Sequence, residues 1–444
     1  MKRIAVAGLI LVAVAAATVL GGIIGPAPTS PASPADHPPQ AAVDLLERRI
    51  AEAQQRLRRV PGDWSAWAEL GLAYLEHARI TADPTYYPKA EEAVGRSLAV
   101  KPDENTDALA ARGALANARH DFTDARRDAL AAIAINAYHA ESYAVLADAQ
   151  TQLGEADLAT ASVQRLLDLR PGLSGYARAS YDLEQRGKLA EATDLMRRAL
   201  AVAVDRADIA FCRNQLGDLA WNSGDLATAG TQYAAGLRAD ASSVALRRGQ
   251  ARVAAAQGRT AQALYSYASL TLSAPTPGYL LEYSELLRVA GRAGDADTQL
   301  TLATAAHRLF TDNGGSDALT GAALAEASGR PAEALADARA EWSRRQHADV
   351  ADALGWALHL SNQDTEALGY ARRALATGAR SAVYAYHLGM IELALGDRTG
   401  AVAGLRQALE INPWFSPTGA PEAHRALAAL ESAAPGGGAA VRSR

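Results

Sequence analysis

The sequence is poor in the residues that build disulfides and basic surfaces. Cys212 is the one cysteine in 444 residues, so the chain can form neither an internal disulfide nor a Cys-x-x-Cys metal or redox site. Only four of the 44 lysine and arginine residues are lysine, and the net charge is −5. Nucleic acid is bound through clustered basic charge. We therefore expect no nucleic-acid partner.

The sequence also lacks the common catalytic motifs. It contains no Gly-x-Ser-x-Gly elbow, phosphate-binding loop or dinucleotide fingerprint. Its histidines are scattered, and no two stand four residues apart as metal ligands on one helical face would. His347, Asp349 and Asp352 are close in sequence but span a predicted helix start, so we expect them not to converge. These absences predict a protein that is not an enzyme and that holds no cofactor or metal.

A long uncharged run opens the sequence. Lys2 and Arg3 precede residues 4–25, which carry no charge and are long enough to cross a bilayer. The two charges should stay in the cytoplasm, which places the rest of the chain outside. The run exceeds the usual signal-peptide core of about 7–15 apolar residues. We expect residues 1–25 to be a signal-anchor of a single-pass membrane protein; the alternative is a cleaved signal peptide and a secreted protein.

A proline-rich linker follows at residues 26–40. Proline fixes φ and lacks the N–H that a helix needs, so this segment should stay extended. It would hold the folded part of the chain away from the membrane.

The rest of the chain is an internal repeat. A glycine or asparagine stands five residues before an alanine, and the pair recurs every 33 to 38 residues. The pairs are Gly154 and Ala159, Gly187 and Ala192, Gly224 and Ala229, Gly258 and Ala263, Gly291 and Ala296, Gly329 and Ala334, Asn362 and Ala367, and Gly396 and Ala401. His120 and Ala125 form a degenerate pair, and Ala90 precedes them all. A period near 34 indicates a helical repeat.

Each unit is expected to hold two helices of about 12–14 residues joined by a turn. Glycine and asparagine tolerate the left-handed conformation that ends a helix. Aspartate often follows, as in "LGDRTG", "SGDLAT" and "AGDADT", where it can cap the second helix. The alanine falls where the two helices cross, because a larger side chain would push them apart.

These features resemble the tetratricopeptide repeat family over about residues 61–415, in ten units. The residues that carry the resemblance are Trp67, Leu70, Gly71 and Tyr74 in the first unit, Leu216, Gly217, Ala229 and Tyr233 in a middle one, and Leu388, Gly389, Ala401, Leu405, Ala408 and Pro413 in the last. The first unit departs by about seven extra residues around 79–87. The resemblance implies an all-α, right-handed superhelical solenoid, here preceded by the membrane or export helix.

The segments that flank the repeats complete the predicted domain organisation. Solenoids need polar-faced caps at both ends, and we expect capping helices at residues 41–60 and 416–432. The tail at 433–444 should be disordered.

The resemblance also implies a binding site, because first helices of this family line a concave groove. The candidate groove residues are Tyr181, Phe211, Asn214, Asp218, Trp221, Asn222, Arg248, Arg252 and Arg288. Phe211 and Trp221 are larger than packing there requires, and the arginines could pair with carboxylates. The hypothesis is a clamp for an acidic or C-terminal peptide segment; alternatively, Asp218 neutralises an arginine, or these residues serve only surface and packing.

Three functions follow from this organisation. The first is a membrane-tethered extracytoplasmic scaffold or adaptor that binds a protein or peptide in its groove. The second is a permanent structural subunit of a bacterial envelope assembly or secretion complex, which a large apolar patch on the outer face would favour. The third is a sensor or carrier of a small solute, which a closed, polar-lined cavity would favour.

Overall fold

The computed structural model describes residues 38–432. This range holds 22 α-helices and one 3-10 turn, and it contains no strand. The predicted membrane segment at 1–25, nearly all of the linker and the tail at 433–444 lie outside the described residues. Within residues 38–432, none of the helices combines the length and apolar character needed to cross a bilayer.

Ten helix pairs follow one another along the chain. Units one to five are α2 (Trp64–Thr81) with α3 (Tyr87–Val100), α4 (Thr106–Ala118) with α5 (Phe122–Ile135), α6 (Ala140–Leu153) with α7 (Ala156–Leu169), α8 (Leu173–Gln185) with α9 (Leu189–Val202), and α10 (Arg206–Asn222) with α11 (Leu226–Ala239). Units six to ten are α12 (Val244–Ala256) with α13 (Thr260–Ser273), α14 (Pro277–Val289) with α15 (Ala293–Asp312), α16 (Ala318–Ala327) with α17 (Pro331–Arg344), α18 (Ala348–Leu360) with α19 (Asp364–Ala374), and α20 (Ala382–Ala394) with α21 (Arg398–Ile411).

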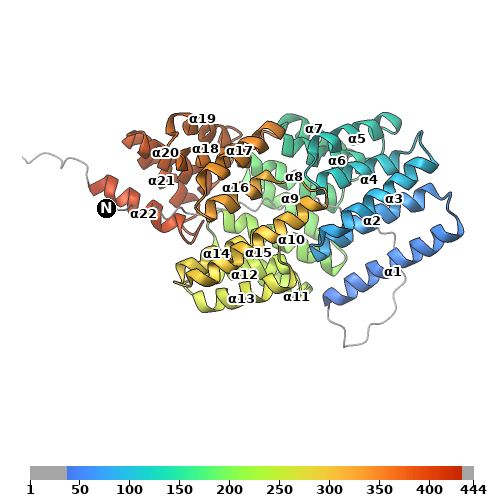
Figure 1. Cartoon of the computed structure of the whole chain (residues 1–444), viewed down its shortest axis with the longest axis horizontal. Helices are drawn as coiled ribbons and strands as arrows, with labels where there is room; N and C mark the ends of the chain where they lie inside the picture. The colour runs from blue at the N-terminus through green and yellow to red at the C-terminus, as the bar shows by residue number, and fades with distance from the viewer. Residues whose placement is uncertain (1–37, 433–444) are drawn as a thin grey trace, which may run out of the picture.

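One helix flanks the array on each side. The helix α1 (Pro38–Arg59) precedes unit one where we predict a cap at 41–60, and α22 (Gly419–Ser432) follows unit ten where we predict a cap at 416–432. In Figure 1 the molecule is elongated, with α1 to α5 at one end and α20 to α22 at the other.

The turns inside the units confirm the repeat. Positive φ occurs at all nine predicted turn positions, which are His120, Gly154, Gly187, Gly224, Gly258, Gly291, Gly329, Asn362 and Gly396. Even the degenerate His120 adopts this conformation, at φ 61°. The first unit differs because its extra residues form a 3-10 turn, η1 (Pro84–Tyr86), between α2 and α3.

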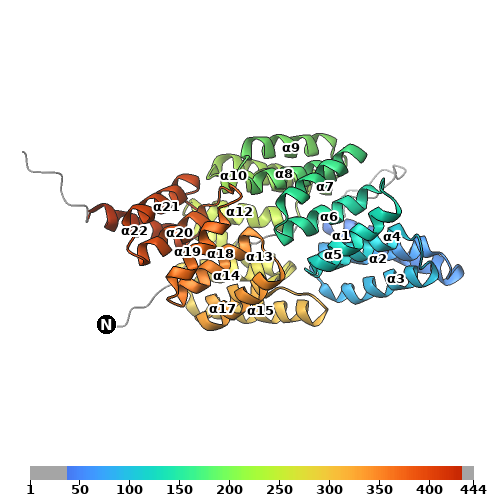
Figure 2. The ribbon, with the colours of Figure 1, turned by 90° about the horizontal axis from the view of Figure 1, so that it is seen from above.

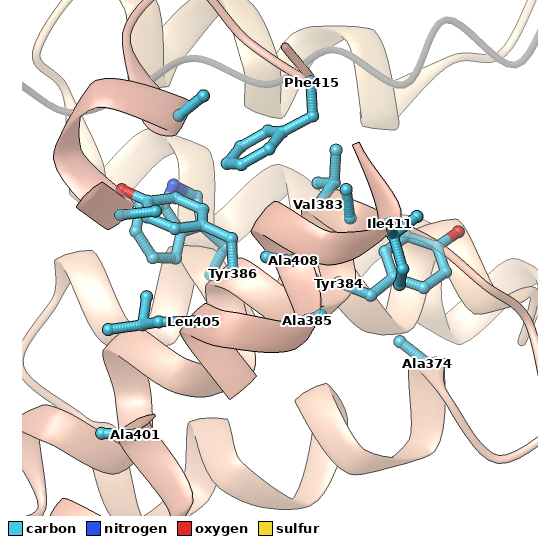
Figure 3. Close-up of a cluster of buried hydrophobic side chains, with 14 of the residues drawn as sticks. Ala374, Val383, Tyr384, Ala385, Tyr386, Ala401, Leu405, Ala408, Ile411 and Phe415 are labelled. Atoms are coloured by element: carbon cyan, nitrogen blue, oxygen red, sulfur yellow. The ribbon is translucent and has the colours of Figure 1, made fainter. Parts of the chain in front are cut away.

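The predicted crossing alanines are buried. Ala263 and Ala401 are fully inaccessible to solvent, and a Cβ added at Gly389 would lie 2.9 Å from the backbone nitrogen of Leu405. The two helices of unit ten therefore touch backbone to backbone. Figure 3 shows the cluster that forms around this crossing, where Tyr386 of α20 lies near Phe415 with ring centroids 5.4 Å apart.

Two of the three aspartates proposed as caps take that role. Asp225 accepts a hydrogen bond from the backbone N–H of Thr228, and Asp397 accepts one from that of Gly400. The third prediction is wrong, because α15 already begins at Ala293 and Asp295 lies in its first turn. Asp295 follows the turn glycine, Gly291, by four residues and not by one, so it lies too far along the helix to cap it. Its side chain pairs with Arg292 at 2.7 Å instead.

The array curves back until later units contact earlier ones. The backbone N–H of Ser316 donates to the carbonyl of Arg119 at 2.8 Å, Arg345 donates to Gln152 at 2.7 Å, and Asn412 donates to the carbonyl of Trp221 at 2.8 Å. In each case the turn of one unit meets the segment that ends the unit five places later. We call this set of contacts, between the turns of units two to five and the segments that end units seven to ten, the seam. Figure 2 shows the molecule from above, with α8 and α9 along one edge and α15 and α17 along the opposite edge.

Close backbone approach explains two glycines of the seam. A Cβ at Gly187 would lie 2.2 Å from the carbonyl oxygen of Gly378, and one at Gly154 would lie 2.5 Å from that of Gln346. The corresponding glycine of unit six, Gly258, has no atom within 4 Å of such a Cβ. Glycine is thus required at the seam for space as well as for its positive φ.

Candidate binding surface on the inside of the superhelix

The first helices of opposite units bring ionisable side chains together on the inside of the curve. We call this surface the axial face. Glu184 of α8 lies close enough to Asp218 of α10 and Asp349 of α18 for their charges to interact. Burial raises the pKa of Glu184 to about 7, and the two neighbouring carboxylates act in the same direction.

Three of the predicted groove residues form hydrogen bonds with neighbouring side chains of the chain. Asn222 donates a hydrogen bond to Glu184 at 2.8 Å, and Asn214 donates one to Asp218 at 2.8 Å. Asp218 also accepts the hydroxyl of Tyr233 at 2.7 Å. These contacts place Asn214, Asp218 and Asn222 on one continuous polar surface.

The predicted arginines are occupied within the chain. Arg248 is paired through two nitrogens with Glu282, with the Nε–Oε2 distance at 2.8 Å, and Tyr267 donates to the same carboxylate at 2.9 Å. Burial opposes ionisation of Glu282, yet Arg248 holds its pKa below the usual value. The guanidinium of Arg252 lies 4.3 Å from the ring centroid of Trp221, a cation–π contact.

The remaining three predicted residues lie apart or serve packing. Arg288 pairs with Asp297 at 2.7 Å, where both side chains are exposed to solvent. Phe211 packs against the core between units four and five, beside Met196. Tyr181 is next to Asp349 and Glu184, and burial together with these carboxylates raises its pKa well above 10.

Two further acidic residues, Glu285 and Glu326, belong to the axial face. Glu285 accepts hydrogen bonds from Ser416 at 2.8 Å and Thr418 at 2.6 Å, and burial raises its pKa to about 7. Glu326 accepts one from the indole N–H of Trp356 at 2.9 Å, and burial raises its pKa to about 8, with Asp352 and Glu285 adding to the effect. Glu326 is the one charged residue of α16, and a lone acid in an apolar helix is the signal that could have identified it.

A histidine lies next to this cluster. His387 stacks on Trp356 with ring centroids 4.1 Å apart, and its Nδ1 lies 2.9 Å from Asp352. Its Nε2 is buried without a hydrogen-bond partner. A buried polar atom without a partner is costly, so this nitrogen would gain from a ligand or water.

The sequence-based expectation for His347 is wrong in part. Nδ1 of His347 lies 3.2 Å from Asp349, so these two residues do converge at the start of α18. Within residues 38–432, no three His, Cys, Asp or Glu side chains are arranged to hold a metal ion.

The family model of the tetratricopeptide repeat matches residues 382–413, which are unit ten. Unit ten therefore matches a tetratricopeptide repeat. No curated protein matches it by sequence. The turn and crossing residues of unit ten recur in the other units.

Several solved structures are similar to this chain. A tetratricopeptide repeat protein from Parabacteroides merdae is 16% identical over 58% of this chain and 98% of its own, with a TM-score of 0.36. The human IFIT1 dimer with m7Gppp-AAAA is 14% identical over 74% of this chain and 76% of its own, with a TM-score of 0.47. Pseudomonas aeruginosa pilF is 15% identical over 48% of this chain and 92% of its own, with a TM-score of 0.36. At this degree of likeness, the ligands of those proteins are not carried over.

On the axial face of the array, the arginines have partners within the chain and several carboxyl groups do not. Arg248 has its carboxylate and Arg252 has its aromatic ring. Within the described residues, the groups that act on the charge of Glu184, Glu285 and Glu326 include no lysine, arginine or histidine. The axial face therefore carries carboxyl groups without a cationic partner, and a positively charged group could pair with them.

Proposed function

We propose that the protein is a non-enzymatic scaffold that binds a segment of a partner protein along the axial face of its tetratricopeptide array. The observation that supports this is the set of three carboxyl groups, Glu184, Glu285 and Glu326, that have hydrogen-bond donors but no cation. A lysine or arginine of the partner would supply the missing charge and favour the ionised form of these carboxyl groups.

This proposal changes the expected ligand. The acidic or C-terminal peptide was inferred from Arg248, Arg252 and Arg288, and each of these already contacts a carboxylate or an aromatic ring of the chain. A partner carboxylate would have to break the Arg248 pair and leave Glu282 buried without its cation, which is costly. A basic segment meets no such obstacle.

We further propose that the array is a right-handed superhelix tethered outside the cytoplasm by residues 1–25. The charged pair Lys2 and Arg3 ahead of an uncharged run of bilayer length supports this arrangement. Cleavage of that segment would instead give a secreted protein.

A second candidate function is a permanent structural subunit, and one surface favours it. The helix α13 has no charged residue, and it exposes Tyr265 and Leu272 by 79% and 88%. These two residues are seven apart, so they lie on the same face of the helix. An uncharged face of this kind is typical of a lasting protein contact.

Affinity capture from detergent-solubilised membranes with quantitative mass spectrometry tests both functions. The bait is the wild-type chain, a Glu184→Gln/Glu285→Gln/Glu326→Gln variant, or a Leu272→Glu variant. The scaffold function predicts a partner that elutes with added salt and is reduced at least ten-fold on the triple variant alone. Loss on the Leu272→Glu variant alone would support the structural subunit instead. A recovery that neither variant changes would rule out the axial face.

The same experiment reports on the tether. The most N-terminal peptide recovered from the bait shows whether residues 1–25 remain attached. Circular dichroism of each bait controls for folding, and glutamine is chosen because it resembles the protonated carboxyl group.

A further inference from the structure

Two adjoining cavities lie between α1, α2 and α3, at the end of the array that follows the linker. They have volumes of about 300 and 370 Å³, and both are lined by Gln54, Tyr74 and Lys89. We call them together the first-unit groove. It is built where the chain departs from the repeat, by the flanking helix α1 and by the extra turn η1.

The groove has an apolar floor and aromatic walls. Leu57 and Leu70 are almost completely buried beneath it. Tyr74 and Tyr86 stand at its side, with ring centroids 6.0 Å apart, and Trp67 closes one end. The hydroxyl of Tyr74 accepts a hydrogen bond from Gln54 and the indole of Trp67 donates to the carbonyl of Pro61, so the rings of Tyr74 and Trp67 present apolar surface. The ring of Tyr86 is instead stacked on His77, with centroids 3.9 Å apart.

The rim of the groove carries hydrogen-bond donors. Lys89 holds its ammonium group 3.7 Å from the ring centroid of Tyr86, and Arg58 lines the same cavity. His77 lines the second cavity, is 5% exposed, and has no hydrogen-bond partner at Nε2. The nearest acid to that nitrogen is Glu47, at 3.7 Å. A ligand rich in acceptors would satisfy these donors.

The chain itself contains such a segment directly before α1. Pro28, Pro31 and Pro34 are three residues apart, and a polyproline II helix has three residues per turn, so this conformation puts all three rings on one face. Proline has no N–H, so the segment brings carbonyl acceptors and few donors. Proline-rich segments bind aromatic-lined grooves in this way.

The length of the chain fits. Residues 28–37 in polyproline II conformation extend about 28 Å, at about 3.1 Å per residue. The step from Pro38 to Gln54 along α1 is about 24 Å, at about 1.5 Å per residue. A segment that turns back at the start of α1 and runs along it therefore reaches the middle of the groove.

We propose that the proline-rich segment 26–37 of this chain occupies the first-unit groove. Its proline rings lie against Tyr74 and Trp67, and its carbonyl groups accept hydrogen bonds from His77 and Lys89. The docking does not depend on the axial face. Its consequence rests on the proposed tether: an anchored segment that docks here holds the first unit next to the membrane, in place of a free linker.

Disulfide trapping in the full chain tests the proposal. The native Cys212 is buried, so two introduced cysteines report on each other. The test pair is Ser33→Cys with Ala51→Cys, because Ala51 lines the groove. The control pair is Ser33→Cys with Glu52→Cys, because Glu52 is exposed on the same helix and does not line the groove. We expect the test pair to cross-link at least ten-fold faster than the control pair. Replacing Pro28, Pro31 and Pro34 with alanine should bring the fast pair down to the control rate.

Lysine acylation gives a second measurement without new cysteines. We expect Lys89 to react several-fold more slowly than the exposed Lys188 in the wild-type chain, and to lose that protection in the triple-proline variant. Equal cross-linking of the two cysteine pairs, with Lys89 as reactive as Lys188, would overturn the proposal. Cross-links that join two chains would overturn it as well, because the groove would then hold the segment of a second copy.

Discussion

Glu326 is the residue whose charge fits its surroundings least. It lies in the apolar helix α16, its one polar contact is Trp356, and its pKa is raised to about 8. An ordinary glutamate ionises near 4.3, so the unfolded chain has lost this proton at pH 7 while the folded chain still holds it. The stabilisation from Glu326 is complete below about pH 4.5 and is lost as the pH rises through about 8.

The first prediction follows from this sign. Glu326→Gln cannot ionise and keeps an acceptor for Trp356, so at pH 8.5 it should be more stable than the wild type by at least about 1 kcal/mol. At pH 4, below the pKa of the unfolded carboxyl group, the difference should nearly vanish. Urea unfolding at both pH values measures the change, with Glu410→Gln on the exposed side of α21 as the control. Equal pH dependence of the wild type and Glu326→Gln would contradict the assignment.

Residue roles set by one helix were predictable, and roles set by a distant partner were not. The turn position of His120 and the burial of Ala401 follow from spacing alone. The pairing of Arg248 with Glu282 does not, because the carboxylate comes from the next unit, 34 residues away. The repeat spacing predicts that Arg248 lies on the inside of the curve, but it does not predict that the side chain is already paired with a carboxylate of the chain.

At the scale of the element, the helix pair depends on how closely its two helices approach. In unit ten the helices α20 and α21 cross at Ala401 and Gly389, with no room for further carbon atoms. Overpacking a rigid crossing displaces backbone and costs about 1–3 kcal/mol. Because each unit packs mainly on its neighbours, the damage should stay near the C-terminal end of the array.

The second prediction compares two alanines of one helix. Ala401→Leu should lower the free energy of unfolding by about 1–3 kcal/mol, whereas Ala403→Leu, two residues on and exposed to solvent, should change it by less than about 0.5 kcal/mol. Chemical denaturation followed by circular dichroism measures both. Hydrogen exchange should show the loss of protection in α20 to α22 and not in α2 to α5. Equal effects of the two substitutions would argue against a steric crossing.

The elements themselves were largely readable from the sequence, and the exceptions have local causes. Repeated turn residues define ten helix pairs, and η1 arises from the extra residues of unit one. The start of α15 was misjudged because "AGDADT" looks like the capped turn of other units. In that segment the glycine that adopts positive φ is Gly291, and Asp295 comes one helical turn too late to cap.

At the scale of the whole molecule, the seam determines what the axial face can bind. It joins units two to five with the ends of units seven to ten, and so brings Glu184 and Tyr181 near Asp349 across the inside of the curve. A repeat period does not report curvature, which depends on small rotations summed over many units. For that reason the sequence predicted a groove but not that opposite walls would meet. A seam of this kind favours an extended partner segment over a folded domain.

The last prediction tests the seam with matched glycines. Gly187 and Gly258 have nearly the same positive φ, 70° and 75°, so alanine at either position carries the same backbone cost of about 1–2 kcal/mol. They differ in their surroundings, because only the Cβ at Gly187 would collide with the backbone of Gly378. Gly187→Ala should therefore be less stable than Gly258→Ala by about 1–3 kcal/mol, as measured by urea unfolding.

The maximum dimension from small-angle scattering then shows whether the substitution separates the two sides of the seam or only shifts the backbone locally. An opened seam lets units two to five separate from the ends of units seven to ten, so Gly187→Ala should have a larger maximum dimension than the wild type, while Gly258→Ala should match the wild type. Gly154→Ala, which would meet the carbonyl of Gln346, should behave like Gly187→Ala because both break contacts between units five places apart. If all three variants lose the same stability and keep the maximum dimension of the wild type, contacts other than those of these turns hold units two to five against the ends of units seven to ten.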